Sequence, residues 1–360
     1  MERYLGLDAH GQSCTFGVIG PSGRRIRHDV VETNGAALVQ YVKSLPGRKH
    51  LCLEEGTQSA WLYEILSPHV EEIVVVGLYE KSRGPKDDLR DAFQRAEELR
   101  TNQVQTSVFK APRSFATLRE LSRVHTMLVR DVVRVQSRLK AMYRGRGIPV
   151  AGKTVYGARG REEWLAKLPA SGRAATARLY EEYDALLELK QAAEKEMLSE
   201  AAKQPIAKVL ATAPGLGPIR TAQLLPVVVT PHRFRTRKQF WAYCGLAIVM
   251  RSSSDWVRTE HGGWARARIQ QTRGLNRNHN SRLKSIFKGA ATTVLTSYPT
   301  DPLHEHYRQL TAAGTKPNLA KLTLARRIAA VVLRMWKDGK EYDPETLRAK
   351  QSTDSASPTP

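Results

Sequence analysis

The chain has 360 residues, of which 41% are apolar and 26% charged; this is enough to build sizeable cores and excludes wholesale disorder. No apolar run reaches the roughly 18 residues of a membrane span, and three scattered cysteines exclude a disulfide framework or a zinc site. The formal net charge of +22, concentrated in residues 101–150 and 211–360, predicts nucleic acid rather than a membrane surface as the partner. A cytoplasmic location is expected, because residues 1–4 lead straight into a strand-like segment without a secretory signal.

The first hundred residues alternate between strand-like and helix-like segments. Strands are expected at residues 4–8, 14–19 and 25–31, where apolar and β-branched residues are interrupted by glycine and by a Pro-Ser-Gly turn. A helix at 35–44, a strand at 50–53, a helix at 61–66, a buried strand at 73–76 and a helix at 87–100 follow. This order predicts an α/β fold with a mixed sheet and flanking helices.

Residues 114–203 have a helical period. Apolar side chains recur every three or four residues from Leu118 to Met142, which is the a and d seam of a long helix packed along another helix. Arg130, Arg134 and Arg138 lie on its other faces. A second helix is expected at 174–203 after a glycine-rich connector, so we predict an antiparallel helical hairpin that also serves oligomerisation.

A mainly helical C-terminal region begins at Pro205. Helices are expected at 303–310 and 319–336, with Asn318 as the N-cap of the second. The last ten residues are rich in Ser, Thr and Pro and are expected to be disordered. The chain is therefore predicted to comprise an α/β domain (1–111), a helical hairpin (112–205), a C-terminal domain (206–342) and a tail (343–360).

Acidic residues stand at the ends of predicted elements in the one nearly neutral part of the chain. Asp8 and Glu54 each end a strand, whereas Asp88 and Asp91 lie three apart on one face at the start of a helix. Carboxylates that converge suit Mg²⁺, and two ions about 4 Å apart catalyse phosphoryl transfer. Solvated acids and helix-dipole partners are the competing interpretation of these residues. The histidines, including His10, show no ligand spacing.

These acidic residues, in the order strand–Asp8, strand–Glu54 and Lys86-x-Asp88-x-x-Asp91-Ala92, resemble the DEDD motif of insertion sequence 110 type transposases. The resemblance implies an RNase H-like, RuvC-like domain in which the four acids hold Mg²⁺ as a pair of ions. Glu55 is an alternative to Glu54, because Glu54-Glu55-Gly56-Thr57 stands where the family often has Glu-Ala-Thr-Gly.

A glycine-rich turn in the C-terminal region precedes an apolar helix. In Pro214-Gly215-Leu216-Gly217, free backbone N–H groups of Gly215 and Gly217 are expected to meet a DNA phosphate, as in a helix-hairpin-helix element. A plain glycine-rich connection between helices is the alternative. Cations that follow it are also predicted to bind DNA; they are Arg233, Arg235, Arg237, Lys238 and, further on, Arg277.

The segment from Gly245-Leu246 to three consecutive serines also resembles the family, in its C-terminal transposase domain. The resemblance implies that Ser253, or its neighbour Ser252, is a nucleophile that forms a phosphoserine link with DNA. Judged from the residues alone, the serines beside Arg251 are more readily interpreted as a polar loop, since no activating acid or base stands at a fixed spacing.

The resemblance further implies guidance by a bridge RNA that pairs with donor and target DNA, and a tetramer built from dimers. Arg130, Arg134 and Arg138 are then expected to bind RNA, and the protein to lie with the nucleoid. Two other functions remain open: a metal-dependent DNA junction nuclease that uses the acids and water, and a nucleic-acid-binding protein without enzymatic activity.

Overall fold

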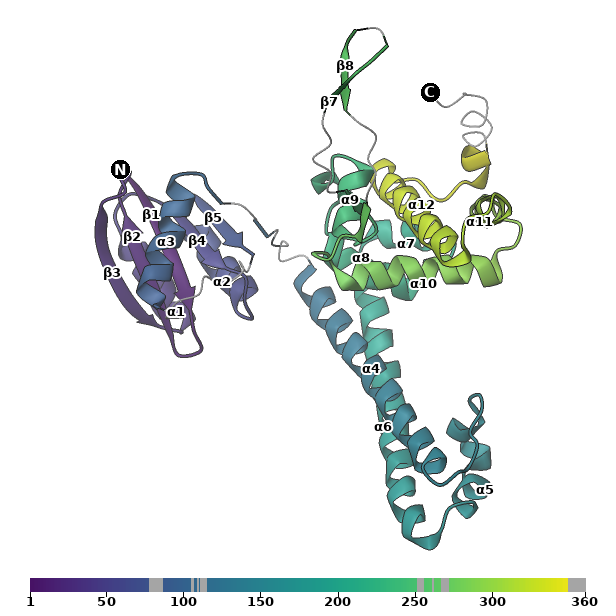
Figure 1. Ribbon diagram of the computed structural model, residues 1–360. Coiled ribbons are helices and arrows are strands. Elements are labelled where there is room, and N and C mark those ends of the chain that lie inside the picture. Colours follow the sequence, from purple (N-terminus) through teal and green to yellow (C-terminus); the bar gives the residue numbers. More distant parts are fainter. Residues whose placement is uncertain are drawn as a thin grey trace. The chain divides into compact units, whose positions relative to one another are not determined.

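The computed structural model describes residues 1–77, 87–104, 107–108, 110, 115–250, 256–260, 262–266 and 272–348. The predicted nucleophiles Ser252 and Ser253, and the part of the predicted tail from residue 349 on, lie outside these ranges. The chain divides into two compact units, residues 1–113 and 114–360 (Figure 1).

The first unit is built on a five-stranded mixed sheet with the order β3-β2-β1-β4-β5. Its strands are β1 (Glu2–Ala9), β2 (Ser13–Ile19), β3 (Arg25–Glu32), β4 (Arg48–Glu54) and β5 (Glu72–Val76). β1, β4 and β5 run parallel, whereas β2 is antiparallel to both of its neighbours. Each of these strands agrees with a predicted one, and the mixed sheet with flanking helices confirms the RNase H-like α/β class.

The two faces of this sheet are covered differently. On one face, Leu5, Phe16 and Leu51 form a core with α1 (Gly35–Ser44) and α2 (Ser59–Leu66). On the other face, α3 (Asp88–Arg100) lies directly on the backbone (Figure 1), since a Cβ added at Gly6 would overlap the carbonyl oxygen of Ala92. Only glycine permits such a close approach of a helix to a strand.

The second unit begins with a helical hairpin formed by α4 (Ala116–Arg144) and α6 (Ala170–Ala202), which run side by side in Figure 1. The predicted seam is confirmed, because Leu118, Val132 and Leu139 of α4 are buried. The glycine-rich connector forms a small insertion, in which η3 (Thr154–Tyr156), η4 (Ala158–Gly160) and α5 (Arg161–Ala166) enclose a small core around Val155.

Helices dominate the rest of the second unit. They are α7 (Pro205–Ala211), α8 (Gly217–Val228), η5 (Pro231–Arg233), α9 (Arg237–Tyr243), α10 (Ser281–Ser297), α11 (Pro302–Ala312) and α12 (Pro317–Asp338). The predicted N-cap of the last helix is wrong: Lys316 occupies that position and Pro317 the first turn, where its missing N–H costs nothing.

Short strands that the sequence did not indicate interrupt these helices. They are β6 (Ile248–Met250), β7 (Trp256–Arg258), β8 (Trp264–Arg266) and β9 (Thr272–Leu275), and they pair as β6–β9 and β7–β8. Leu118 of α4 and Phe115, which directly precedes this helix, share one hydrophobic core with the C-terminal helices. The predicted boundaries at residues 205 and 342 therefore stay predictions within a single compact unit. No helix among the described residues is long and apolar enough to cross a membrane.

Candidate active site

Two carboxylates and an imidazole meet where β1 ends. His10 Nε2 lies 3.2 Å from Asp8 Oδ2 and 3.1 Å from Asp88 Oδ2. One ligand atom from each of the three residues lies within 4.8 Å of the others. Asp8 is buried, whereas Asp88 is about half exposed at 45% of its side chain. The cluster is therefore open to solvent on the side of α3.

Local structure explains how Asp8 and Asp88 meet. Asp87 is the N-cap of α3, and its Oδ1 accepts hydrogen bonds from the N–H groups of Leu89 and Arg90. The cap starts the helix at Asp88 and leaves that side chain in the first turn. Because Gly6 lets α3 lie against β1, this first turn reaches the strand end that carries Asp8.

The structure places Glu54 and Glu55 at the end of β4, in ion pairs of their own. Leu7 is paired with Leu53 in parallel register, so Asp8 and Glu54 follow on the same face of neighbouring strands. Glu54 is bound by Arg95 of α3, which is itself buried. Glu55 is bound by Lys110. Both glutamates, at the end of the strand next to β1, are therefore paired with cations from other parts of the first unit.

Asp91 is half-buried on α3, one turn after Asp88, and makes no ion pair with the residues that the structure describes.

The thiol of Cys52, in β4, is not a competing metal ligand. Burial raises the pKa of Cys52 to about 12, so its sulfur stays protonated at neutral pH. The available donors are carboxylate oxygens and one imidazole nitrogen.

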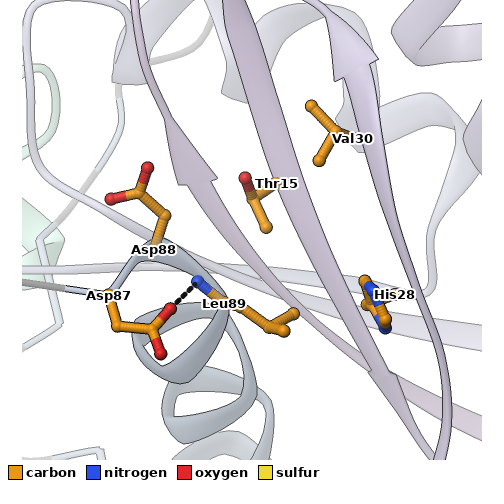
Figure 2. A pocket seen from close by; sticks show the side chains of 6 residues that line it. All are labelled: Thr15, His28, Val30, Asp87, Asp88 and Leu89. Atoms are coloured by element: carbon orange, nitrogen blue, oxygen red, sulfur yellow. Dashed lines mark hydrogen bonds between the residues drawn. The ribbon is translucent and has the colours of Figure 1, made fainter.

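An open pocket of about 440 Å³ borders the cluster and is lined by Thr15, His28, Val30, Asp87, Asp88 and Leu89 (Figure 2). Figure 2 shows Asp87 and Asp88 at the start of the helix and Thr15 and Val30 along the strands. Thr15 is the register partner of both Asp8 and Val30, which places the pocket directly beside Asp8. A group bound there would lie next to the acidic cluster.

The donor set fits a divalent cation. Two carboxylates and one imidazole within a few ångströms suit Mg²⁺ or Mn²⁺, although an imidazole ligand favours Mn²⁺, the softer of the two ions. Sequence reasoning missed His10. The signal was its position two residues after Asp8, since side chains two apart in extended chain point to the same side.

Two segments that are distant in the sequence, residues 243–247 and 276–280, contact each other just before the predicted nucleophiles. Gly245 has φ +66°, and a Cβ there would overlap the His279 ring. Asn276 N donates to Ala247 O, and Asn280 N donates to Tyr243 O. Arg326 of α12 donates through Nε to Leu246 O at 2.6 Å. The backbone that leads into β6 is therefore fixed from two sides.

The predicted DNA-binding residues fall into two groups. Arg235, Arg237 and Lys238 are exposed at the start of α9, and Arg277 is exposed in the turn before α10. Arg233 is half-buried, with its guanidinium 4.8 Å from the centroid of the Tyr243 ring. The first group is accessible to a phosphate, although Arg237 also lies over an aromatic ring, 5.6 Å from the centroid of Trp241.

The glycine-rich turn between α7 and α8 has a packing role that the sequence did not reveal. Gly215 is buried with φ +75°, and a Cβ there would overlap Ala290 O of α10. Arg220 Nη1 donates to Gly215 O. Gly217, at φ +61°, has open space around it. A phosphate contact at these two glycines stays a prediction.

The predicted RNA-binding residues Arg130, Arg134 and Arg138 are exposed on α4. Arg134 pairs with Asp131 of its own helix, and Arg138 pairs with Glu182 of α6. Arg282 of α10 donates to Ser122 Oγ, and its burial together with nearby Arg123 and Arg130 lowers its pKa below the usual range. Positive charge thus gathers where α4 meets α10.

Two family models match the chain. The model for the DEDD transposases of IS110 elements, described as Transposase, matches residues 5–145. The model described as Transposase IS116/IS110/IS902 family matches residues 207–308. No curated protein matches the sequence. The first match covers the acidic cluster, and the second covers the glycine-rich turn and the segment that contains both predicted serines.

Proposed function

Because this chain belongs to the IS110 family of transposases, we propose that it cuts and rejoins DNA strands through a phosphoserine intermediate. The convergence of Asp8, His10 and Asp88 in an open site is the observation that carries the proposal. A divalent metal held at such a site can activate a phosphodiester, and the DEDD family implies a divalent metal.

Asp8 and Asp88 are proposed to hold Mg²⁺, with Glu54 and Asp91 completing an acidic tetrad for two ions. When bound, Mg²⁺ supplies Lewis-acid stabilisation of charge on the phosphate oxygens. The ion pair with Arg95 fixes the orientation of Glu54 at the end of β4, which supports its assignment as a ligand. Glu55, bound by Lys110, is the alternative ligand.

Ser253, or its neighbour Ser252, is proposed to attack the scissile phosphorus. The serine hydroxyl gives up its proton as the new O–P bond forms, and the leaving sugar oxygen takes a proton as its own bond to phosphorus breaks. One ester replaces another, so bond energy is retained for rejoining. Attack by a second sugar hydroxyl reverses the exchange and releases the serine.

Nucleic-acid binding is proposed to be shared along the second unit. Arg130, Arg134 and Arg138 would contact a bridge RNA, while Arg235, Arg237, Lys238 and Arg277 contact donor and target DNA. If the RNA selects the DNA sequence by base pairing, the protein needs to recognise only the sugar-phosphate backbone and the shape of the nucleic acids. Two DNA partners require several active sites, so a dimer or tetramer is proposed, acting in the cytoplasm at the nucleoid.

A covalent-trapping experiment tests this function. Purified protein with Mg²⁺, its co-purifying RNA and labelled DNA from the ends of its element is denatured and run on a gel. We expect a protein–DNA adduct that is lost in Asp8→Asn and in one of Ser252→Ala and Ser253→Ala. Cleaved DNA without an adduct, unchanged in both serine variants, would instead establish hydrolysis by a metal-dependent nuclease.

A further inference from the structure

The β7–β8 hairpin carries two exposed tryptophans. Trp256 is 58% exposed and Trp264 is 65% exposed, which is unusual for the largest apolar side chain. The two strands are joined by a closed turn, in which Thr259 N donates to Gly263 O at 2.8 Å and Gly262 N donates to Thr259 O. Among the described residues these strands pair only with each other.

The register places Trp256, Arg258 and Trp264 on the same face of the β7–β8 hairpin. Arg258 is directly opposite Trp264, and Trp256 is two residues before Arg258 on the same strand. Cross-strand partners and residues two apart share a face of a hairpin, so Trp256, Arg258 and Trp264 form one surface. The Arg258 guanidinium lies 6.0 Å from the centroid of the Trp264 ring. Val257 and Ala265 occupy the opposite face.

We propose that this surface, defined by Trp256, Arg258 and Trp264, is a stacking platform for unpaired bases of a DNA strand. Exposed aromatic rings bind bases through their π faces whatever the base, and arginine adds attraction to rings and backbone phosphates. Bases in a duplex are already stacked on one another, so the ligand is a strand opened by bending or separation.

Charge and position in the chain favour DNA over the other occupants. Residues 211–250, which precede the hairpin, contain five Lys and Arg and no acidic residue, so a strongly anionic partner is attracted to this part of the chain. Trp256 follows Ser253 by three residues in the sequence. The proposal rests on the proposed function at this point, since the strand that the serine would cut is DNA.

Fluorescence anisotropy tests the platform in the full-length protein. The probes are labelled (dT)₁₂, the RNA U₁₂ and a 12-base-pair duplex, with EDTA present so that cleavage does not occur. The test variant is Trp256→Ala with Trp264→Ala. The stacking control is Trp256→Phe with Trp264→Phe, and the control for the opposite face is Val257→Ala. Unchanged circular dichroism and melting temperature establish that each variant is folded.

We expect the double alanine variant to bind (dT)₁₂ about tenfold to a hundredfold more weakly, since one stacked base contributes a factor of roughly 5 to 150. Duplex binding changes less than about threefold, and the phenylalanine and Val257→Ala variants stay close to wild type. The slope of affinity against salt is unchanged, because stacking releases few counterions.

Equal loss on duplex and single strand, or no loss on (dT)₁₂, would overturn the platform. A loss confined to U₁₂ would assign the surface to RNA and overturn the DNA proposal. Repeating the titration in Ser253→Ala, together with the Mg²⁺ trapping experiment described above, separates this inference from the catalytic one. A Ser253→Ala protein that binds (dT)₁₂ normally but forms no adduct retains the platform. A double alanine variant that binds (dT)₁₂ like wild type and still forms the adduct overturns the platform and leaves the catalytic proposal.

Discussion

The two units of this chain present side chains of opposite charge at their candidate sites for binding nucleic-acid phosphates. The first unit is nearly neutral and brings acidic side chains together at the end of β1, beside a buried Asp8. The second unit presents exposed arginines and lysines on α4 and α9. Carboxylates attract a phosphate only through a bound cation, whereas arginine binds it directly. The acidic cluster of the first unit is therefore a candidate metal site, whereas the exposed cations of the second unit are candidate surfaces for binding nucleic acid.

Packing follows the same division. In the first unit a helix rests on strand backbone at Gly6, and this rigid contact holds the acidic residues in place. In the α4–α6 helical hairpin of the second unit, one face of α4 is buried and the remaining faces carry exposed cations. Binding to phosphates tolerates freedom of such side chains, but metal coordination requires preorganised ligands. Changes in the two units should therefore have different consequences.

The largest effect is expected from Asp8→Asn. Loss of a ligand charge should lower strand cleavage about a thousandfold, since metal stabilisation contributes several kcal/mol to the transition state. DNA affinity, measured by anisotropy, should remain within about threefold of wild type. Glu71→Gln, an exposed acid of the same unit, is the control and should cleave normally. Equal loss of binding and cleavage would contradict the division between the units.

Gly6→Ala should lower the free energy of unfolding of the first unit by about 3 kcal/mol, because the new Cβ would overlap Ala92 O and push α3 off the sheet. Urea denaturation followed by circular dichroism measures this change. Gly11→Ala provides the control, since nothing lies within 4 Å of a Cβ there. A stable Gly6→Ala protein that still cleaves DNA would show that the close approach of α3 does not set the site.

In the second unit, the combined change Arg235→Ala, Arg237→Ala and Lys238→Ala should weaken DNA binding about tenfold near 0.1 M salt. The slope of log K against log salt should become shallower by about 3, at roughly 0.9 for each phosphate that is no longer neutralised. A matched variant replaces Arg178, Lys203 and Arg308, which pair with acids of their own helices. An identical change of slope in both variants would refute a local DNA contact at α9.

The smallest effect is expected at the ion pair between Arg161 and Asp184. Hydrogen bonds from Arg161 lower the pKa of Asp184 in the folded state. The ion pair therefore stabilises the folded state fully above the unfolded pKa of about 3.9. This stabilisation is lost as the pH falls through the lowered pKa of the folded state. Because both side chains are partly exposed, the contribution should be below about 1 kcal/mol. Asp184→Asn should melt slightly below wild type at pH 7, and thermal unfolding should show the difference shrinking toward pH 2.

Apolar patterning explains which elements were predictable. Short runs of apolar and β-branched residues bounded by turn residues marked the five strands of the first unit, and the helical period from Leu118 to Met142 marked α4. Strands of three or four residues, such as β7 and β8, are too short to show a period. The cap at Lys316 was missed because Asn318 has the stronger intrinsic preference, whereas Pro317 decides where the helix begins.

The order of elements, the acidic residues at their ends and the asymmetry of charge were determined by the sequence itself. Only the tertiary structure decided that His10 joins Asp8 and Asp88, while Glu54 and Glu55 are bound by Arg95 and Lys110. Asp8 and Asp88 are eighty residues apart, and their meeting depends on how closely α3 approaches β1 at Gly6. Periodicity reports which face of an element is buried, but contact across that face depends on the shapes that pack there.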